Sequence, residues 1–172
     1  MANAPPSMQN LRLVDPITDL PITTVSEGTA ERLRGTVTDA GTLDELTLRV
    51  NWGDLITDEV TLAPGDSFHI DHTYLDAPAA PLNLTIQLLV TDDDGASANG
   101  TIPIQVTNAP PTITGITYTP AVPFEAAKIE LAATTTDPAG AKDALSFTWL
   151  ITGPTGFSLS PTGPSPSFTP KK

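Results

Sequence analysis

Apolar and polar residues alternate along two stretches of the chain. Residues 46–52 (LTLRVNW) and 82–90 (LNLTIQLLV) place an aliphatic or aromatic side chain at every second position. Successive side chains of a β-strand point to opposite faces of its sheet, so each stretch predicts a strand with one apolar face. No stretch has the spacing of a convincing helix. The pattern therefore predicts an all-β protein.

The residues around these stretches are typical of short strands joined by turns. The chain has 18 prolines and 12 glycines, with threonine, valine and isoleucine frequent between them. Residues 151–170 (ITGPTGFSLSPTGPSPSFTP) are too rich in proline for continuous central strands, because proline cannot donate a hydrogen bond to a sheet. We expect an irregular sheet edge there.

An internal repeat divides the chain. Three motifs recur in the same order in its two halves: NAPP at 3–6 and 108–111, TVTD at 36–39 matched by TTTD at 134–137, and a tryptophan at 52 and at 149. The offsets between the matched motifs vary slightly, as different loop lengths in homologous modules would produce. The repeat predicts two related modules.

The paired prolines of VTNAPPT favour an extended, stiff connection and mark the boundary between the modules. We expect an N-terminal extension over residues 1–9, a sandwich domain over 10–107, a linker over 108–111 and a second domain over 112–172. In an immunoglobulin-like order, strand B ends near Asp39 and strands C, F and G occupy about 45–53, 82–91 and 98–107.

Three motifs of the first module resemble, in order and spacing, those of PKD-like domains: VNWGDL at 50–55, HTY at 72–74 and LTIQLLVTDDDGAS at 84–97. PKD-like domains are immunoglobulin-like β-sandwiches that are common in extracellular proteins, and cadherin-like domains are an alternative of the same kind. The second module shows the resemblance only faintly, through FTWLITGPTG at 147–156. The resemblance implies tandem immunoglobulin-like sandwiches in a secreted or cell-surface protein of a bacterium.

The second module is expected to be incomplete, because it contains no counterpart of strands F and G. Their loss would remove about six inward aliphatic side chains, each worth about 1.5–3 kcal/mol, which rivals the whole stability of an ordinary domain. Three explanations stay open: an abbreviated variant, a chain that is part of a longer protein, or strands supplied by a partner chain through β-augmentation.

The run Asp92, Asp93 and Asp94 in VTDDDGAS is the strongest chemical feature. It is first of all a hairpin turn, since aspartate and glycine are favoured there without any metal. Alternation places Asp92 in line with the inward residues and Asp93 outward, with Gly95 supplying a positive φ.

Calcium binding is the functional alternative for this run. Ca²⁺ takes six to eight oxygen ligands, more than three adjacent aspartates can aim at one point. The B–C loop lies at the same end of the module, so Asp39, Asp44 and Glu45 are candidate additional ligands. No helix-loop-helix calcium motif is present.

A second candidate calcium site lies at the junction of the modules. Cadherin-like tandems bind Ca²⁺ at such junctions. The topology places three carboxylates at the end of the first module that leads to the linker and two at the facing end of the second: Glu27, Asp54 and Asp76, and Asp137 and Asp143. A solvated acidic rim is the alternative interpretation.

Charge and composition exclude several classes of function. The net charge of −12 disfavours nucleic acid and anionic membranes. The absence of cysteine excludes disulfides and thiolate catalysis. The only histidines, His69 and His72, would face opposite sides of a strand, and neither a nucleophile elbow nor a phosphate loop is present. We predict a protein that is not an enzyme and does not enter a membrane.

The sequence therefore predicts a non-enzymatic structural or adhesion module that spaces neighbouring domains of a larger extracellular protein. Two alternatives are a calcium-dependent module that binds proteins or glycans at a cell surface and an accessory domain of a secreted hydrolase. A third is an assembly subunit completed by a strand from a partner, including self-assembly by strand donation.

Overall fold

The computed structural model of the chain describes residues 3–78, 80–122, 124 and 126–170. The chain divides into two units, 1–109 and 110–172. Each unit is described by itself.

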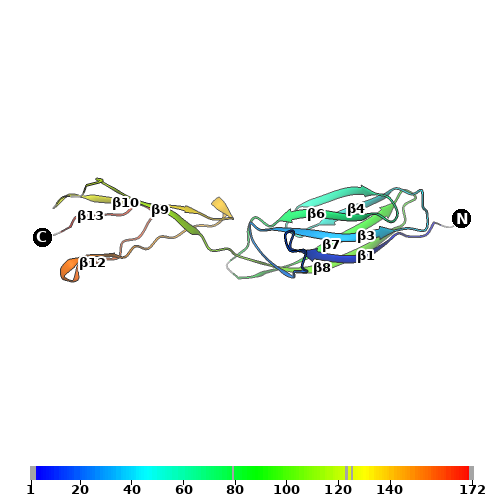
Figure 1. Ribbon diagram of the computed structural model, residues 1–172, viewed down its shortest axis with the longest axis horizontal. Coiled ribbons are helices and arrows are strands. Elements are labelled where there is room, and N and C mark those ends of the chain that lie inside the picture. Colours follow the sequence, from blue (N-terminus) through cyan, green and yellow to red (C-terminus); the bar gives the residue numbers. More distant parts are fainter. Residues whose placement is uncertain (1–2, 79, 123, 125, 171–172) are drawn as a thin grey trace. The chain divides into compact units, whose positions relative to one another are not determined.

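The first unit is a β-sandwich of two sheets (Figure 1). One sheet has the strand order β1-β3-β6, with bounds Ser7–Val14, Ala30–Thr38 and Ser67–Thr73. The other has the order β2-β8-β7-β4-β5, with bounds Thr24–Ser26, Ser97–Thr107, Leu82–Asp92, Leu46–Asn51 and Thr57–Leu62. This arrangement is the immunoglobulin-like order, which confirms the predicted fold class.

Strands β4 and β7 form where the sequence alternates, and they pair in antiparallel register from Leu46 opposite Asp92 to Asn51 opposite Gln87. Strand β7 turns into β8 through a tight hairpin, in which Gly95 has a φ of 90°. Asp92 lies in line with the inward residues, as the alternation predicts. The predicted strands B, C, F and G agree with β3, β4, β7 and β8 to within two residues.

The predicted N-terminal extension over residues 1–9 needs correction. Strand β1 begins at Ser7, because Ser7 and Gln9 pair with Thr38 and Thr36 of β3. Residues 7–9 are therefore part of the sandwich. The register between β1 and β3 is irregular between Gln9 and Arg12. The polar residues at the start of β1 hide the strand from a search for alternation.

Side chains from both sheets fill the space between them. The core cluster contains Leu33 and Val37 from β3 and Leu48, Ile86 and Leu88 from the facing sheet. Each of these side chains is at most 1% exposed. Burial of such an aliphatic side chain contributes about 1.5–3 kcal/mol, so this layer is the main source of the unit's stability.

Trp52 closes one end of this core. The ring of His72 stacks on it, with centroids 4.4 Å apart and planes 7° apart, and Tyr74 meets His72 edge-on at 4.7 Å. The Tyr74 hydroxyl donates to the carbonyl oxygen of Trp52 at 2.9 Å. The HTY motif therefore has a structural role, as expected for His72.

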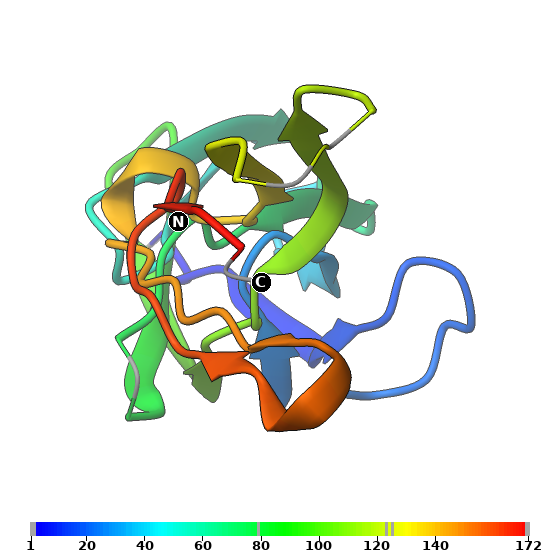
Figure 2. The same cartoon turned by 90° about the vertical axis from the view of Figure 1, so that its left-hand side faces the viewer.

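The second unit consists of a small sheet and a separate hairpin. The sheet has the order β9-β10-β13, with bounds Thr112–Thr119, Ile129–Thr136 and Ser167–Phe168. The hairpin joins β11 to β12, Ile151–Thr152 and Ser158–Leu159. Figures 1 and 2 show this hairpin on the opposite side of the unit from β9 and β10.

Proline breaks the strands of this region into two-residue pieces, which fits the predicted irregular edge. Two short 3₁₀ turns, Gly140–Lys142 and Pro154–Gly156, are the helical segments of the described chain. No helix among the described residues is long and apolar enough to cross a bilayer.

The second unit buries little apolar surface. Among the described residues, its buried apolar side chains are Ala127, Ile129, Ala139 and Pro166. Trp149, which we expect in a core, is only half-buried, and its Nε1 donates to the carbonyl oxygen of Gly163 at 2.8 Å. The corresponding Trp52 of the first unit is fully buried. The predicted second sandwich is therefore incomplete.

The packing of the first unit can be tested with a pair of leucine substitutions. Leu48 is fully buried, so Leu48→Ala should lower the free energy of unfolding by about 2–5 kcal/mol. Leu43 is 96% exposed, and Leu43→Ala should change it by less than about 0.5 kcal/mol. Urea unfolding followed by Trp52 fluorescence, in a Trp149→Phe background, measures both effects. Similar effects from the two substitutions would contradict the packing.

Candidate functional site

Three carboxylates gather at the end of the first unit that carries the β7–β8 turn. Asp39 follows β3, Asp44 precedes β4 and Asp92 ends β7. One oxygen of each lies within 4.8 Å of an oxygen of the other two. We call this group the terminal carboxylate cluster. It forms because β4 lies next to β7, so the loop before β4 lies beside the turn after β7.

Asp92 holds this end of the unit together. Its side chain is 4% exposed, and its Oδ1 accepts a hydrogen bond from the backbone N–H of Ala96 at 2.8 Å, which closes the turn. The Nδ2 of Asn3 donates to both oxygens of Asp92, at 3.1 and 3.0 Å. Asp92 therefore ties the incoming chain to the β7–β8 turn.

The loop before β4 shapes the other side of the cluster. Oδ1 of Asp39 accepts from the backbone N–H of Gly41 at 2.8 Å, while Oδ2 is shielded from solvent and has no hydrogen-bond partner. A side chain at position 41 would collide with the Asp44 carboxylate, which would have to move away from the cluster. A cleft beside the cluster is lined by Asn3, Gly41, Asp44 and Asp94 among others.

The cluster is electrostatically strained. Partial loss of solvent raises the pKa of Asp44 above its ordinary value, and the negative charges of Asp93, Asp39, Asp94 and Asp92 raise it further. A cation would relieve this repulsion. Two oxygens on opposite sides of a Ca²⁺ ion lie about 4.8 Å apart, since each is about 2.4 Å from the ion. The oxygens of the cluster lie within this limit.

The structure thus brings together three of the six residues predicted for this end, Asp39, Asp44 and Asp92, while Glu45 is exposed. Asp93 and Asp94 are exposed and contribute charge to the site. The predicted metal site stays a prediction. Sequence reasoning missed Asn3 and Gly41, and no local signal points to the contact of Asn3 with a residue 89 positions away.

Two of the residues predicted for the junction, Glu27 and Asp54, form hydrogen bonds within the first unit. Glu27 is 1% exposed and accepts backbone N–H bonds from Ala77 at 2.6 Å and Ala109 at 3.1 Å. Asp54 accepts from the backbone N–H of Ile56 at 3.0 Å and contacts Nε2 of His72 at 2.9 Å. Glu27 and Asp54 therefore stabilise loops of the first unit.

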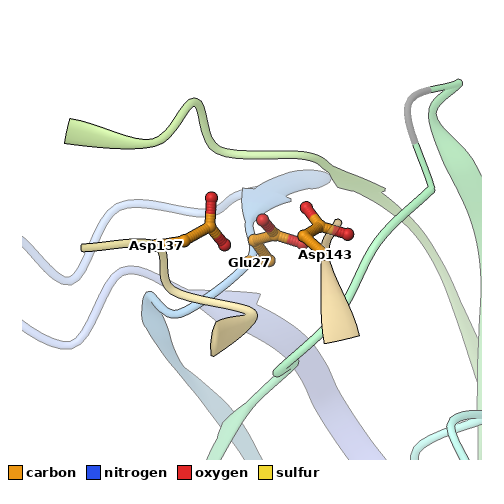
Figure 3. Close-up of side chains that lie close together, drawn as sticks. All are labelled: Glu27, Asp137 and Asp143. Carbon is orange, nitrogen blue, oxygen red and sulfur yellow. The ribbon is translucent and has the colours of Figure 1, made fainter. Parts of the chain in front are cut away.

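The remaining junction candidates include one carboxylate in the first unit and two in the second. Asp76 is exposed in the connection before β7. A carboxylate oxygen of Asp137 and one of Asp143 lie within 4.8 Å of each other. Figure 3 draws these two residues together with Glu27. A site shared by the two units stays a prediction, because it depends on how the units are placed relative to one another.

A buried carboxyl group on β3 was not foreseen. Glu31 is fully buried, and neither of its side-chain oxygens has a hydrogen-bond partner. It lies opposite His72 in the β3–β6 register and points inward with Leu33 and Val37. Its phase with Leu33 was the available sequence signal. Burial raises its pKa to about 8, with further contributions from the charges of Asp54 and Asp71.

Comparison with known proteins gives one solved structure to report. Neither the protein-family models nor the curated proteins contain a match to this chain. The chain is similar to the "PKD domain of M14-like peptidase from Thermoplasmatales archaeon SCGC AB-540-F20", with 22% sequence identity and a TM-score of 0.47. The match covers 62% of this chain and 99% of that one. The fold class of the first unit rests on its own strand topology.

Glu31 should make the stability of the first unit depend on pH. Its folded-state pKa of about 8 lies above the ordinary 4.5, so its contribution to stability is fully present below pH 4.5 and is lost as pH rises through about 8. The slope is at most about 1.4 kcal/mol per pH unit. Glu31→Gln cannot ionise, so it should melt close to the parent at pH 4 and higher than the parent above pH 8.

Calorimetry across pH 4–9 measures this difference, with Glu59→Gln as the control because Glu59 is exposed on β5. The control should follow the parent at every pH. If Glu31→Gln also follows the parent throughout, the carboxyl group is ionised without penalty in the folded protein, and this account of Glu31 is wrong.

Proposed function

We propose that the first unit is a non-catalytic structural module that connects and spaces neighbouring domains of an extracellular protein. The observation that carries this proposal is the way the chain enters and leaves the sandwich. Asn3 is bound to Asp92 at one end of β7, and Ala109 is bound to Glu27 near the other. Figure 1 shows residues 3–6 and 107–109 at opposite ends of this unit.

The distance between these two attachment points is set by β7. This strand has 11 residues, and at about 3.3 Å per residue it spans roughly 35 Å. Each attachment uses a buried carboxylate, Asp92 or Glu27, so both flanking segments are fixed to the sandwich. Such a module holds its two neighbours in the chain at a defined separation.

The terminal strands are arranged to resist tension. Strand β2 pairs with β8 in parallel, from Thr24 opposite Gln105 to Ser26 opposite Thr107. The flanking bonds, from Gln105 N–H to the Thr23 carbonyl and from Glu27 N–H to the Thr107 carbonyl, are both 2.9 Å long. Pulling the two ends apart loads these bonds together along the strand direction. The pairing supports a mechanical role.

The proposed extracellular location is supported by the resemblance of the first module's motifs to domains of extracellular proteins. An accessory role beside a secreted hydrolase would use the same spacing geometry. Glycan recognition would need a strip of exposed aromatic side chains, and the exposed aromatic residues of the described chain are Tyr118 and Phe124 of the second unit.

Single-molecule force spectroscopy tests the mechanical role. The chain has no cysteine, so Ala4→Cys and Ala109→Cys provide unique handles at the two ends of the first unit. The backbone of Val25 faces β8, as that of Thr23 and Glu27 does, whereas the N–H of Thr24 faces away. Val25→Pro should lower the unfolding force clearly, and Thr24→Pro should leave it near the parent value.

Two outcomes would count against this role: a parent unfolding force no higher than that of a simple hairpin, or equal effects of the two proline substitutions. Either would show that β2 and β8 do not carry the load. The equilibrium stability of both variants should be measured beside the force, so that a general loss of folding is recognised.

We propose Ca²⁺ binding at the terminal carboxylate cluster as a second function, which would stiffen this end of the module. The mutual repulsion that raises the pKa of Asp44 and the unpartnered, shielded Oδ2 of Asp39 favour it. Extracellular calcium modules bind with dissociation constants of about 10⁻⁴–10⁻³ M. Affinity in that range would keep such a site occupied outside the cell.

Calorimetry of the full chain in 10 mM CaCl₂ and in chelator tests this second function. At dissociation constants of about 10⁻⁴–10⁻³ M, 10 mM Ca²⁺ is a ten- to hundredfold excess and stabilises a protein by about 1.4–2.7 kcal/mol, which corresponds to a shift of several degrees in the melting temperature. Asp92→Asn keeps a side-chain acceptor for Ala96 but removes the charge, so it should abolish the shift. Glu59→Gln should retain it.

In chelator, Asp92→Asn should be less stable than the parent, because it loses the charge-assisted hydrogen bonds from Asn3. An unchanged melting temperature of the parent in CaCl₂, or a full shift in Asp92→Asn, would mean that the carboxylates form a solvated turn only.

A further inference from the structure

A groove of about 270 Å³ lies on the outer face of the β1-β3-β6 sheet. The inward positions of β3 include Leu33 and Val37, so the residues that alternate with them face away from the core. Polar side chains from all three strands line the groove: Asn10, Arg12, Arg34, Thr36, Ser67 and His69. The lining contains two arginines and no carboxylate. The groove is therefore cationic, although the whole chain has a net charge of −12.

Arg12, Arg34 and His69 form one row across the three strands. Arg12 pairs with Arg34 in the register of β1 with β3, and Arg34 pairs with His69 in the register of β3 with β6. Like charges directly opposite one another on neighbouring strands destabilise a sheet. An anion in the groove would relieve the repulsion between the two guanidinium groups.

Acidic side chains compensate the charge of this face only in part. Arg32 forms a two-bond ion pair with Asp71, at 2.5 and 2.7 Å. Arg34 has longer contacts with Asp19, at 3.2 and 3.3 Å, and its Nε is shielded from solvent without a hydrogen bond. In the part of the chain that the structure describes, no carboxylate pairs with Arg12. The positive charge that remains lies in the groove.

A β-bulge in β1 sets Arg12 opposite Arg34. Gln9 pairs with Thr36 and Arg12 with Arg34, so β1 uses one residue more than β3 between these two pairs. Asn10 lies in this bulge with a φ of 53°, which asparagine tolerates better than most residues. Its carbonyl oxygen accepts a hydrogen bond from Nη1 of Arg12 at 3.3 Å. Bulges are frequent beside active sites, where they redirect a side chain.

The second unit provides a contrast. A groove of about 300 Å³ lies over its β9-β10-β13 sheet. The charged residues in the lining of that groove are Lys128 and Glu130, which form an ion pair at 2.7 Å. A three-stranded sheet of this order therefore does not make a groove cationic by itself. The charge of the first groove comes from its own residues.

We propose that the groove on the β1-β3-β6 sheet binds a sulfate or phosphate group. Each of the three strands contributes at least one hydrogen-bond donor to the lining. A tetrahedral group presents oxygens in three or more directions, whereas a carboxylate presents two oxygens in one plane. Guanidinium groups form strong paired hydrogen bonds with such oxyanions. The hydroxyl oxygens of Thr36 and Ser67 lie 3.1 Å apart, so one hydroxyl hydrogen joins them and the other is left for the ligand.

The charge of the rest of the chain limits the size of the ligand. A net charge of −12 repels a long polyanion. A small molecule with one sulfate or phosphate ester does not meet this repulsion along its length. The groove has room for the charged group together with part of the molecule that carries it.

Nuclear magnetic resonance of the full chain tests this proposal with sodium sulfate, sodium phosphate and sodium acetate, each at the same ionic strength in sodium chloride. Sulfate or phosphate should cause saturable shifts of the amides of Arg34, Thr36 and His69. The amides of Thr117 and Glu130, in the groove of the second unit, should not shift. Acetate should bind at least about tenfold more weakly than the tighter of the two other anions. Tighter binding of sulfate assigns a sulfate ester, and tighter binding of phosphate a phosphate ester.

The variant Arg12→Gln removes one guanidinium group from the groove. Arg12 is exposed, so the fold should be retained, and anion binding should weaken at least about tenfold. Arg49→Gln is the matched control, because Arg49 is exposed on β4 in the other sheet. This control should bind the anion like the parent. Melting temperatures in sodium chloride alone confirm that both variants are folded.

Three outcomes would overturn the proposal. The first is a response in the groove that rises linearly with anion concentration and does not saturate. The second is unchanged binding in Arg12→Gln, or equal weakening in Arg12→Gln and Arg49→Gln. The third is acetate binding as tight as that of sulfate and phosphate, which would assign the groove to carboxylates. None of these outcomes affects the proposed spacer role or Ca²⁺ binding, because they rest on β2, β8, the two attachment points and the terminal carboxylate cluster.

Discussion

The lateral pairing of β4 with β7 is the interaction on which the rest of the structure depends. It places the inward residues of two alternating strands side by side in one sheet, where they close over Leu33 and Val37 of the other. The same pairing brings the loop before β4 next to the turn after β7 and so creates the terminal carboxylate cluster. Among the described residues of the second unit, no strand takes the place of β7, and Phe147 and Trp149 are only partly buried. The difference between the units is therefore the difference between a closed and an open sandwich.

Three buried carboxyl groups have two distinct roles in the first unit. Asp92 and Glu27 are satisfied by backbone or amide donors, and each fixes one flanking segment of the chain. Glu31 has no such donor, and burial keeps its carboxyl group protonated over much of the physiological range. A satisfied buried charge stabilises a local connection, whereas an unsatisfied one makes stability depend on pH. These roles place stiffness at the two ends and sensitivity to pH at the start of β3, opposite His72.

Much of this architecture could be predicted from the sequence, and the missing parts have physical reasons. Period-two alternation located β4 and β7 and the inward position of Asp92, because burial on one face imposes that period. The alternation did not locate β2, because this strand has only three residues, too few to show a period. It pairs in parallel with β8. The polar start of β1 has no such period either, so the sequence predicted an extension there. Asn3 was missed because its partner, Asp92, is distant in sequence. Glu31 was missed because its role follows from the lack of any hydrogen-bond partner. Trp149 was expected in a core that its unit does not complete.

Native-state hydrogen exchange of the full chain tests most directly whether the β4–β7 pairing makes the closed sandwich. The amides of β4, β7 and β8 should exchange only through global unfolding of the first unit, with one shared free energy. Amides of β10 and β11 in the second unit should exchange through much smaller openings. Equal protection of the two units in the isolated chain would contradict this account, because the second unit would then be a stable domain without the strand that we consider essential.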